Sequence, residues 1–282
     1  MGNIKLTYTK DFGKHHIDAL AVMEGQKYKT FTHSEQAKGF ETNYFKYNNL
    51  KAGANVSWGD VQSDSKEYTL SSYMARVNYM FADKYILTAN LRADGSSKLG
   101  SGHKWGWFPS ASAAWVLSQE NFLKNVKWID NLKLRAGYGV TGSQPSDSFL
   151  GKSLLGYGDY YLYNGKWIRA LQPTQNANST LKWEEKHEVD LGMDFSILDY
   201  RINGTIDYYY RLIKGLLYDY AVPSPPNLYT TTRANVGEMS NHGLEVMINA
   251  IPVKTHDLTW SSTVTFSTNT NKLKSLSNDL YK

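Results

Sequence analysis

Two pairs of residues have types that suggest hydrolysis or metal binding, but neither pair has the spacing that this chemistry requires. Glu184 and Glu188 share one side of a predicted strand and lie about 13 Å apart at the rise of an extended chain. Glycoside hydrolysis by two carboxylates needs roughly 5 to 10 Å between them. His15 and His16 are adjacent, so their side chains point to opposite faces of a strand and cannot bind one metal ion together. We therefore expect structural roles for all four residues.

The segment Gly151-Lys152-Ser153 resembles the end of a phosphate-binding loop, but Ser146 stands where that motif requires its first glycine. The chain contains no cysteine, which excludes disulfides, thiolate metal sites and cysteine nucleophiles. No set of Ser, His and Asp has a geometry that supports nucleophilic catalysis. The sequence therefore predicts that the protein is not an enzyme and uses no cofactor or metal.

A cluster of aromatic residues lies in the long segment 143–181, among glycines and asparagines. Aromatic faces beside short polar side chains suit sugar stacking or contact with a protein, and connecting segments often carry function. The alternative is a loop that packs on its own rings. The candidate contacts for a substrate or partner are Tyr157, Tyr160, Tyr161, Tyr163 and Trp167.

The elements that must position these residues are strands, because apolar and polar residues alternate with a period of two. Residues 73–81 and 85–94 are typical: each carries apolar side chains on one parity and polar ones on the other, and a three-residue turn separates them. About ten strands are predicted, and no domain boundary interrupts them. They cover residues 3–9, 15–24, 68–81, 85–94, 104–117, 131–142, 182–195, 201–213, 242–251 and 258–269, with a helical turn capped by Ser118 before the sixth.

The connections between these strands alternate between short and long, with long ones at 25–67, 95–103, 143–181 and 214–241. An outer-membrane barrel has this pattern, because its periplasmic turns are short and its extracellular loops are long. A soluble β-sandwich has no reason to keep its long loops at one end, although it remains an alternative. The polar parity is also too charged for a sandwich core. The residues expected to face a wet lumen are Arg76, Asn78, Asn90, Arg92, Glu184, Glu188 and Asp190.

Large aromatic rings recur on the apolar parity at intervals that fit the height of a membrane. Trp107 and Trp115 are separated by roughly 20 Å of height in a tilted strand, and Trp183 and Phe195 by roughly 30 Å. These values bracket the roughly 25 Å apolar band of such barrels, which aromatic girdles flank. The predicted girdle residues are Trp107, Trp115, Trp183, Phe195 and Trp260.

Composition narrows the function classes further. The chain has 31 Lys and Arg against 26 Asp and Glu, and these residues are spread along it rather than gathered in a basic stripe. Nucleic-acid binding is therefore not expected. No run approaches the roughly 18 to 20 apolar residues of a membrane-spanning helix. The fold class predicted is all-β, an antiparallel transmembrane β-barrel in the outer membrane, in contact with its lipid.

Several motifs resemble those of the SusC/RagA-type TonB-dependent receptors of the outer membrane of Bacteroidetes. The similarity covers most of residues 68–272. The residues that carry it are 91–98 (LRADGSSK), 104–115 (KWGWFPSASAAW), 132–142 (LKLRAGYGVTG), 207–210 (DYYY) and 241–245 (NHGLE).

This resemblance implies a barrel of about 22 strands, of which residues 1–282 would be an internal part. A signal peptide, a plug domain, a TonB-contacting segment and the remaining strands are expected elsewhere in the parent protein. The implied function is import of glycan or peptide fragments with a SusD-type surface lipoprotein and energy relayed by TonB. The alternative is a structural or adhesive barrel that displays its loops.

Overall fold

A computed structural model describes residues 1–57 and 59–276. Within them the chain forms thirteen strands and two short 3-10 helices, η1 (Leu50–Ala52) and η2 (Leu117–Gln119), and neither helix is long and apolar enough to cross a membrane. The strands are β1 (Gly2–Phe12), β2 (His15–Glu35), β3 (Val61–Phe81), β4 (Tyr85–Ser96), β5 (Trp105–Val116), β6 (Ile129–Ser143), β7 (Leu155–Tyr163), β8 (Lys166–Pro173), β9 (Glu184–Ile197), β10 (Ile202–Ala221), β11 (Thr231–Lys254), β12 (Thr259–Ser267) and β13 (Thr270–Ser275).

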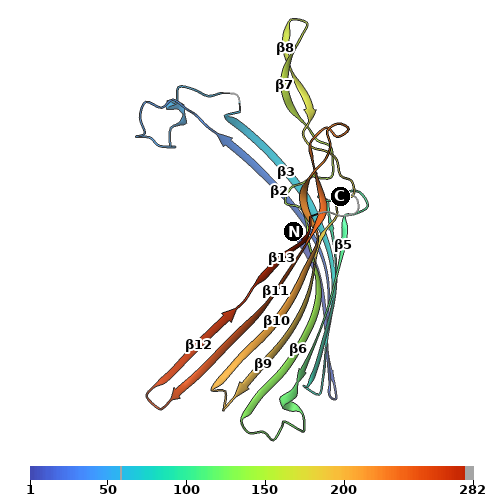
Figure 1. Ribbon diagram of the computed structural model, residues 1–282, viewed down its shortest axis with the longest axis vertical. Coiled ribbons are helices and arrows are strands. Elements are labelled where there is room, and N and C mark those ends of the chain that lie inside the picture. The colour runs from blue at the N-terminus through green and yellow to red at the C-terminus, as the bar shows by residue number, and fades with distance from the viewer. Residues whose placement is uncertain (58, 277–282) are drawn as a thin grey trace.

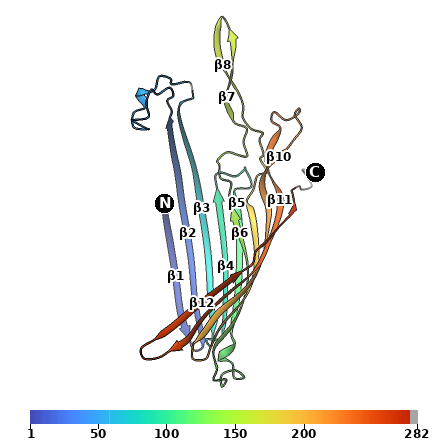
Figure 2. The same cartoon turned by 60° about the vertical axis from the view of Figure 1, so that its left-hand side comes forward.

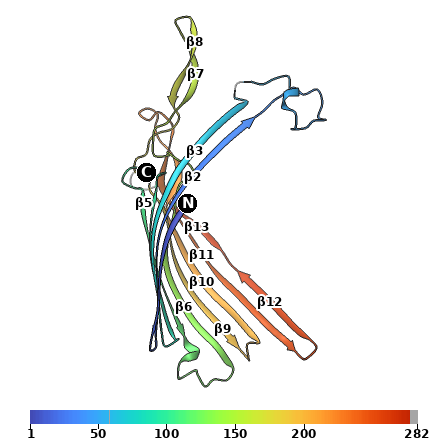
Figure 3. The ribbon, with the colours of Figure 1, turned by 180° about the vertical axis from the view of Figure 1, so that it is seen from behind.

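Eleven of these strands form one curved antiparallel sheet, in the order β1-β2-β3-β4-β5-β6-β9-β10-β11-β12 with β13 also paired to β11. Figures 1 and 3 show this sheet from opposite sides. Strand β6 pairs with β9, because β7 and β8 leave the sheet and form a separate hairpin. Figure 2 shows the short turns at one end of the sheet and the hairpin projecting beyond the other. The all-β antiparallel fold predicted from the alternation is confirmed.

Several strands are longer than predicted, so the long connections are shorter. Strands β2 and β3 stay in register from His15↔Phe81 to Glu35↔Val61, which leaves residues 36–60 as the connection rather than 25–67. Cross-strand pairs hold this polar extension together: Lys27 bonds to Glu67 at 2.8 Å, and the rings of Tyr28 and Tyr68 stack at 4.6 Å. Such pairs stabilise a ladder without apolar alternation. Strands β10 and β11 likewise shorten the predicted 214–241 loop to 222–230.

The register between neighbouring strands separates an apolar face from a polar one. Leu87 lies opposite Ala113, which lies opposite Ala136, which lies opposite Leu191, so one row of apolar side chains crosses β4, β5, β6 and β9. Leu87 and Leu191 are each 51% exposed. We call the side of the sheet with this row the apolar face. No segment among the described residues packs over it.

The adjacent row, which lies one residue away on each strand, is polar. It runs from Thr88 through Ser112 and Gly137 to Asp190. We call this side of the sheet the polar face. Because side chains alternate across a strand, a shift of one residue in any pairing would exchange the two faces.

Aromatic side chains form a row of neighbouring rings along the short-turn end of the apolar face. Ring centroids are 5.1 Å apart from Phe12 to His15, 4.9 Å from His15 to Phe81, and 6.3 Å both from Phe81 to Tyr85 and from Tyr85 to Trp115. These residues come from five successive strands, so the row runs across β1 to β5. The ring of His15 belongs to it.

A second group of rings lies towards the other end of the apolar face. Trp105 stacks on Tyr73 at 5.8 Å, and Trp107 lies opposite Ala93 with 63% of its surface exposed. At the short-turn end, Trp260 near the start of β12 is 56% exposed, whereas Phe195 near the end of β9 is half-buried beside Gly204. The rings at the two ends of the face are therefore separated by aliphatic rows.

Trp183 does not lie on the exposed apolar surface, which corrects its prediction as a girdle residue. It is 7% exposed and meets Phe108 edge to face at 5.4 Å, with Val140 beside them. Its indole N–H donates to the carbonyl of Lys104 at 3.0 Å. The pairing of β5 with β6 stops at Ser110↔Gly139, so Phe108 and Val140 come from the parts of the two strands that are no longer paired. Trp183 fills the space that this separation opens.

The Glu120 side chain connects the aromatic row to the segment that links β5 and β6. Its carboxylate accepts hydrogen bonds from the Tyr85 hydroxyl at 2.7 Å, the Lys84 ammonium at 3.1 Å and the Trp115 indole at 3.2 Å. These bonds hold the pKa of Glu120 below its usual range. The helical turn in this link begins after Val116, and no side chain caps it, so the prediction of a Ser118 cap is wrong.

We predict that the two faces differ in their tolerance of charge. Leu87→Arg places a cation on the apolar face and should cost about 2 to 4 kcal/mol when the parent barrel folds into lipid vesicles. Thr88→Arg, one residue away on the polar face, should cost much less. The measurement is the free energy of unfolding of each variant in urea. Equal losses would show that the apolar face does not contact lipid.

A second prediction concerns pH and Glu120. A carboxyl with a lowered pKa stabilises the folded state at all pH values above its unfolded pKa of about 4.3, and this stabilisation disappears as the pH falls through the lower native value. Glu120→Gln should therefore unfold at lower urea than the wild type at pH 7, and this difference should be smaller at pH 3. Glu41→Gln, in the exposed 36–60 connection, is the control and should change neither midpoint. A wild-type advantage that persists unchanged at pH 3 would contradict the role of the ionised carboxylate.

Candidate functional site

The predicted polar residues of β3 and β4 lie together on the polar face and form hydrogen bonds across the strands. Arg76 donates to Asn90 at 2.9 Å, and Asn90 donates to Ser110 on β5 at 3.1 Å. Asn78 accepts from the Thr88 hydroxyl at 2.9 Å. These side chains therefore form a continuous polar surface from β3 to β5.

Further towards the long-loop end, Arg92 takes part in a second group. Its guanidinium bonds to Asp94 on the same strand at 2.7 Å and to the Ser72 hydroxyl on β3 at 3.1 Å. Asp94 is buried, so its carboxylate needs this partner. The sequence motif at residues 91–98 thus has a structural role at the rim of the sheet.

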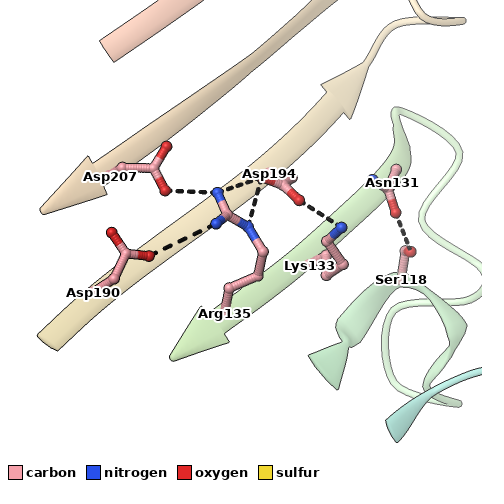
Figure 4. Close-up of polar contacts among 7 residues, drawn as sticks. All are labelled: Ser118, Asn131, Lys133, Arg135, Asp190, Asp194 and Asp207. Atoms are coloured by element: carbon pink, nitrogen blue, oxygen red, sulfur yellow. Dashed lines mark hydrogen bonds and ion pairs between the residues drawn. The ribbon is translucent and has the colours of Figure 1, made fainter. Parts of the chain in front are cut away.

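The largest group of charges on the polar face surrounds Arg135 of β6 (Figure 4). Its Nε donates to Asp194 of β9 at 3.0 Å, and its Nη2 donates to Asp207 of β10 at 2.6 Å. Asp190 lies 3.9 Å from Nη1, and Lys133 bonds to the other oxygen of Asp194 at 2.7 Å. The network therefore joins three strands.

Gly192 allows the side chain of Arg135 to extend past the neighbouring strand and contact Asp207. Gly192 of β9 lies between Arg135 of β6 and Asp207 of β10 in the ladder. A Cβ atom at Gly192 would overlap the Asp207 carboxylate and lie 2.6 Å from Nη2 of Arg135. The absence of a side chain on the middle strand therefore lets a side chain from one neighbour bond to the other.

The predicted acidic residues of β9 also find partners. Glu188 accepts from Arg211 of β10 at 2.7 Å, and Glu184 accepts from the backbone N–H of Leu217 at 3.3 Å. Residues 1–57 and 59–276 contain no group of three or more His, Asp or Glu side chains arranged to hold a metal ion. The carboxylates of this face are used in ion pairs and hydrogen bonds.

Lys133 and Arg135 are not among the site residues predicted from the sequence. The alternation does place both on the polar side of a predicted strand, because they fall between the apolar residues Leu132, Leu134 and Ala136. What the alternation could not show was that Arg135 reaches past its neighbouring strand. That contact depends on the register of β6, β9 and β10.

The five candidate aromatic residues of segment 143–181 lie on the hairpin of β7 and β8 rather than in an irregular loop. Leu162↔Trp167, Tyr160↔Arg169 and Tyr157↔Leu171 are opposite pairs that share one face, which we call the Trp167 face. Tyr161↔Ile168 and Tyr163↔Lys166 share the other, which we call the Tyr163 face. The structure therefore divides the five rings into groups of three and two.

Cation–π contacts confirm this division. The guanidinium of Arg169 lies 5.1 Å from the ring centre of Tyr157 and 5.7 Å from that of Tyr160, so these two rings share its face. Its Nε also donates to the carbonyl of Gly158 at 3.2 Å. The irregularity between Tyr157 and Tyr160 in β7 thus leaves both rings on the Trp167 face.

The base of the segment that carries the hairpin is fixed to the rim of the sheet. The Lys98 ammonium is buried, donates to the carbonyls of Pro145 at 3.1 Å and Ser146 at 2.7 Å, and lies 4.1 Å from the ring centre of Tyr68. Burial lowers the pKa of Lys98. At the other end, Asn178 donates to the carbonyl of Arg233 at 2.9 Å. The hairpin therefore projects from an anchored base.

The charged network gives a testable difference in stability. Arg135→Met leaves Asp194 and Asp207 without their shared cation and should destabilise the parent barrel by about 1 to 3 kcal/mol. Arg76→Met, on the same face but bonded to the neutral Asn90, should cost less. Urea unfolding in vesicles measures both. Equal costs would mean that the network contributes no more than a single hydrogen bond.

Comparisons with known proteins agree with this architecture. The family model described as TonB dependent receptor-like, beta-barrel, matches residues 5–281. The TonB-dependent receptor P39 of Formosa agariphila is 33% identical over 274 residues, which are 96% of this chain and 26% of that protein. The TonB-dependent receptor SusC of Bacteroides thetaiotaomicron is 31% identical over 278 residues, 97% of this chain and 27% of that protein. The chain thus spans about a quarter of the length of these relatives.

Solved structures show the same fold. The RagAB peptide importer in its closed-closed state superposes with a TM-score of 0.82 at 22% identity, over 98% of this chain and 30% of that one. The ferric enterobactin receptor of Pseudomonas aeruginosa superposes with a TM-score of 0.59 at 18% identity, over 94% of this chain and 35% of that one. The family that the matching model and the named relatives define is one of receptors rather than enzymes. The chain therefore belongs to the β-barrel family of TonB-dependent receptors of the outer membrane, of the SusC and RagA type.

Proposed function

We propose that this chain is part of the wall of an outer-membrane receptor that imports oligosaccharide or peptide fragments. The observation that carries the proposal is the division of the sheet into an exposed apolar face and a face of paired charges. In a closed barrel the apolar face contacts lipid and the polar face lines a water-filled lumen. Arg76, Asn78, Asn90, Arg92 and the residues around Arg135 then line the passage for the substrate.

The rest of the parent protein supplies what this part of the wall lacks. Barrels of about 22 strands have wide lumens that a plug fills, so we expect a plug domain, a TonB-contacting segment and further strands in the parent. The exposed rings Trp107, Trp115 and Trp260 serve as an aromatic girdle at the two membrane surfaces. We also propose a surface lipoprotein of the SusD type as partner at the long-loop end, in keeping with the relatives SusC and RagAB.

The hairpin of β7 and β8 is the element of this chain best placed to meet a partner or substrate. It projects beyond the rim of the sheet, and Tyr157, Tyr163 and Trp167 are each more than half exposed. A ring in a well-packed contact contributes on the order of 1 to 3 kcal/mol. The five rings together can therefore account for a large part of an encounter at this rim.

Growth and uptake experiments test the proposal. A strain without the receptor should fail to take up oligosaccharides or peptides that the parent strain uses, and the wild-type gene should restore uptake only when TonB is present. The receptor with Tyr157, Tyr160, Tyr161, Tyr163 and Trp167 all changed to Ala should restore uptake poorly while its barrel folds normally. Unchanged uptake in the strain without the receptor, together with lost surface adhesion, would instead support a barrel that displays loops.

A further inference from the structure

The segment between β5 and β6, residues 117–128, is the longest connection at the short-turn end of the sheet. The others cover residues 13–14, 82–84, 198–201 and 255–258. After η2 the segment stays tightly turned, because the carbonyl of Glu120 accepts from the backbone N–H groups of Leu123 at 3.0 Å and Lys124 at 2.7 Å. We call it the 117–128 link. The short turns of outer-membrane barrels face the periplasm, so the link lies at that surface.

The 117–128 link is held beside the apolar face at both of its ends. The Glu120 carboxylate bonds to Tyr85 and Trp115, which lie opposite each other in the aromatic row of that face. At the other end, the carbonyl of Trp128 accepts from the backbone N–H of Leu198 at 3.0 Å. The link lies below β6 in Figure 1. It is therefore continuous with the surface that faces lipid in an outer-membrane barrel.

Two large rings of the 117–128 link are exposed. Phe122 is 66% exposed and Trp128 is 56% exposed, and beside them Leu198 and Tyr200 of the adjacent turn are 48% and 61% exposed. Apolar groups of this size are unfavourable in water. Aromatic side chains are enriched where the hydrocarbon of a membrane meets its headgroups. The position of the link next to the Trp115 ring matches this level of the membrane.

The exposed charge of the 117–128 link is positive. Lys124 and Lys127 are exposed and form no ion pair with any residue of 1–57 or 59–276. The acidic groups nearby have partners, because Glu120 bonds to Lys84 at 3.1 Å and the half-buried Asp130 accepts a backbone N–H of the adjacent turn at 2.8 Å. The two lysines are therefore available to an anion from outside the chain.

Rings and lysines together fit the headgroup and chains of an anionic phospholipid. An ammonium group binds phosphate as a point charge, and the exposed amides of Asn121 and Asn125 supply further donors. Amphipathic segments of this kind bind a membrane surface by burying apolar side chains and by attraction to anionic lipids. In the adjacent turn Asp199 and Arg201 carry opposite charges and leave this balance unchanged. A zwitterionic headgroup offers the lysines no net charge.

We infer that the 117–128 link binds an anionic glycerophospholipid of the periplasmic leaflet. Lys124 and Lys127 hold the phosphate, and Phe122 and Trp128 insert beside the acyl chains. Glu120 positions the link, because its bonds to the aromatic row keep it at the membrane surface. The inference requires that the barrel lies in the outer membrane, and it does not depend on which substrate the receptor imports.

Native mass spectrometry of the full-length receptor in detergent tests this binding. The receptor is titrated separately with phosphatidylglycerol and with phosphatidylcholine of the same chain length. We expect the wild type to bind phosphatidylglycerol at least fivefold more tightly than phosphatidylcholine. Lys124→Gln with Lys127→Gln should reduce this preference to less than twofold. Lys46→Gln with Lys51→Gln removes the same charge from the exposed 36–60 connection and should keep the wild-type preference.

A second variant and a competitor separate a lipid site from a phosphate site. Phe122→Ser with Trp128→Ser should weaken the binding of phosphatidylglycerol at least threefold, and glycerol 3-phosphate at the concentration of the lipid should not displace it. Resistance to trypsin shows that each variant is folded, and the single change Lys124→Gln repeats the comparison if a double variant is not. Equal affinity of the wild type for the two lipids overturns the inference. A preference that survives in the lysine variant, or that is lost in the control, overturns it as well.

Discussion

The pairing register between neighbouring strands is the constraint on which the rest of this structure depends. In lipid each backbone N–H and C=O of a strand must be paired with the next strand, and side chains of successive residues then point to opposite faces. The row Leu87, Ala113, Ala136 and Leu191 is apolar only because four strands keep one register. A slip of one residue in any pair would place Asp190 or Thr88 in lipid.

Small residues let contacts form that simple alternation does not provide. Gly192 allows Arg135 to bond to Asp207 across the middle strand. Gly106 likewise leaves space for the ring of Trp183, because a Cβ atom there would lie 2.9 Å from the indole Cδ1. These glycines stand where side chains of other strands cross, and both fall in stretches of alternating sequence. Ion pairs thus stabilise the polar face of the sheet, and packed rings stabilise it near its rim.

The long-loop end combines an anchored base with an exposed arm. Buried groups such as Lys98 fix the segment to the rim, whereas the hairpin above it leaves its apolar face uncovered. Exposed apolar patches of this size mark interaction sites in soluble regions of proteins. The same fold therefore combines a wall of paired strands with a hairpin whose apolar side chains are exposed.

The amino-acid sequence alone determined the features that depend on one strand at a time. The period of two assigned Leu87 and Thr88 to different faces and located most strands and turns. Together with the motifs at 91–98 and 132–142, it indicated the family. Only the tertiary structure decided contacts between segments distant in sequence. Trp183 has the parity of an exposed ring, yet it is buried where β5 and β6 part, and the rings of 143–181 divide between two faces because β7 pairs with β8. Such contacts depend on register and on the gaps between strands, and neither is encoded in the alternation of a single segment.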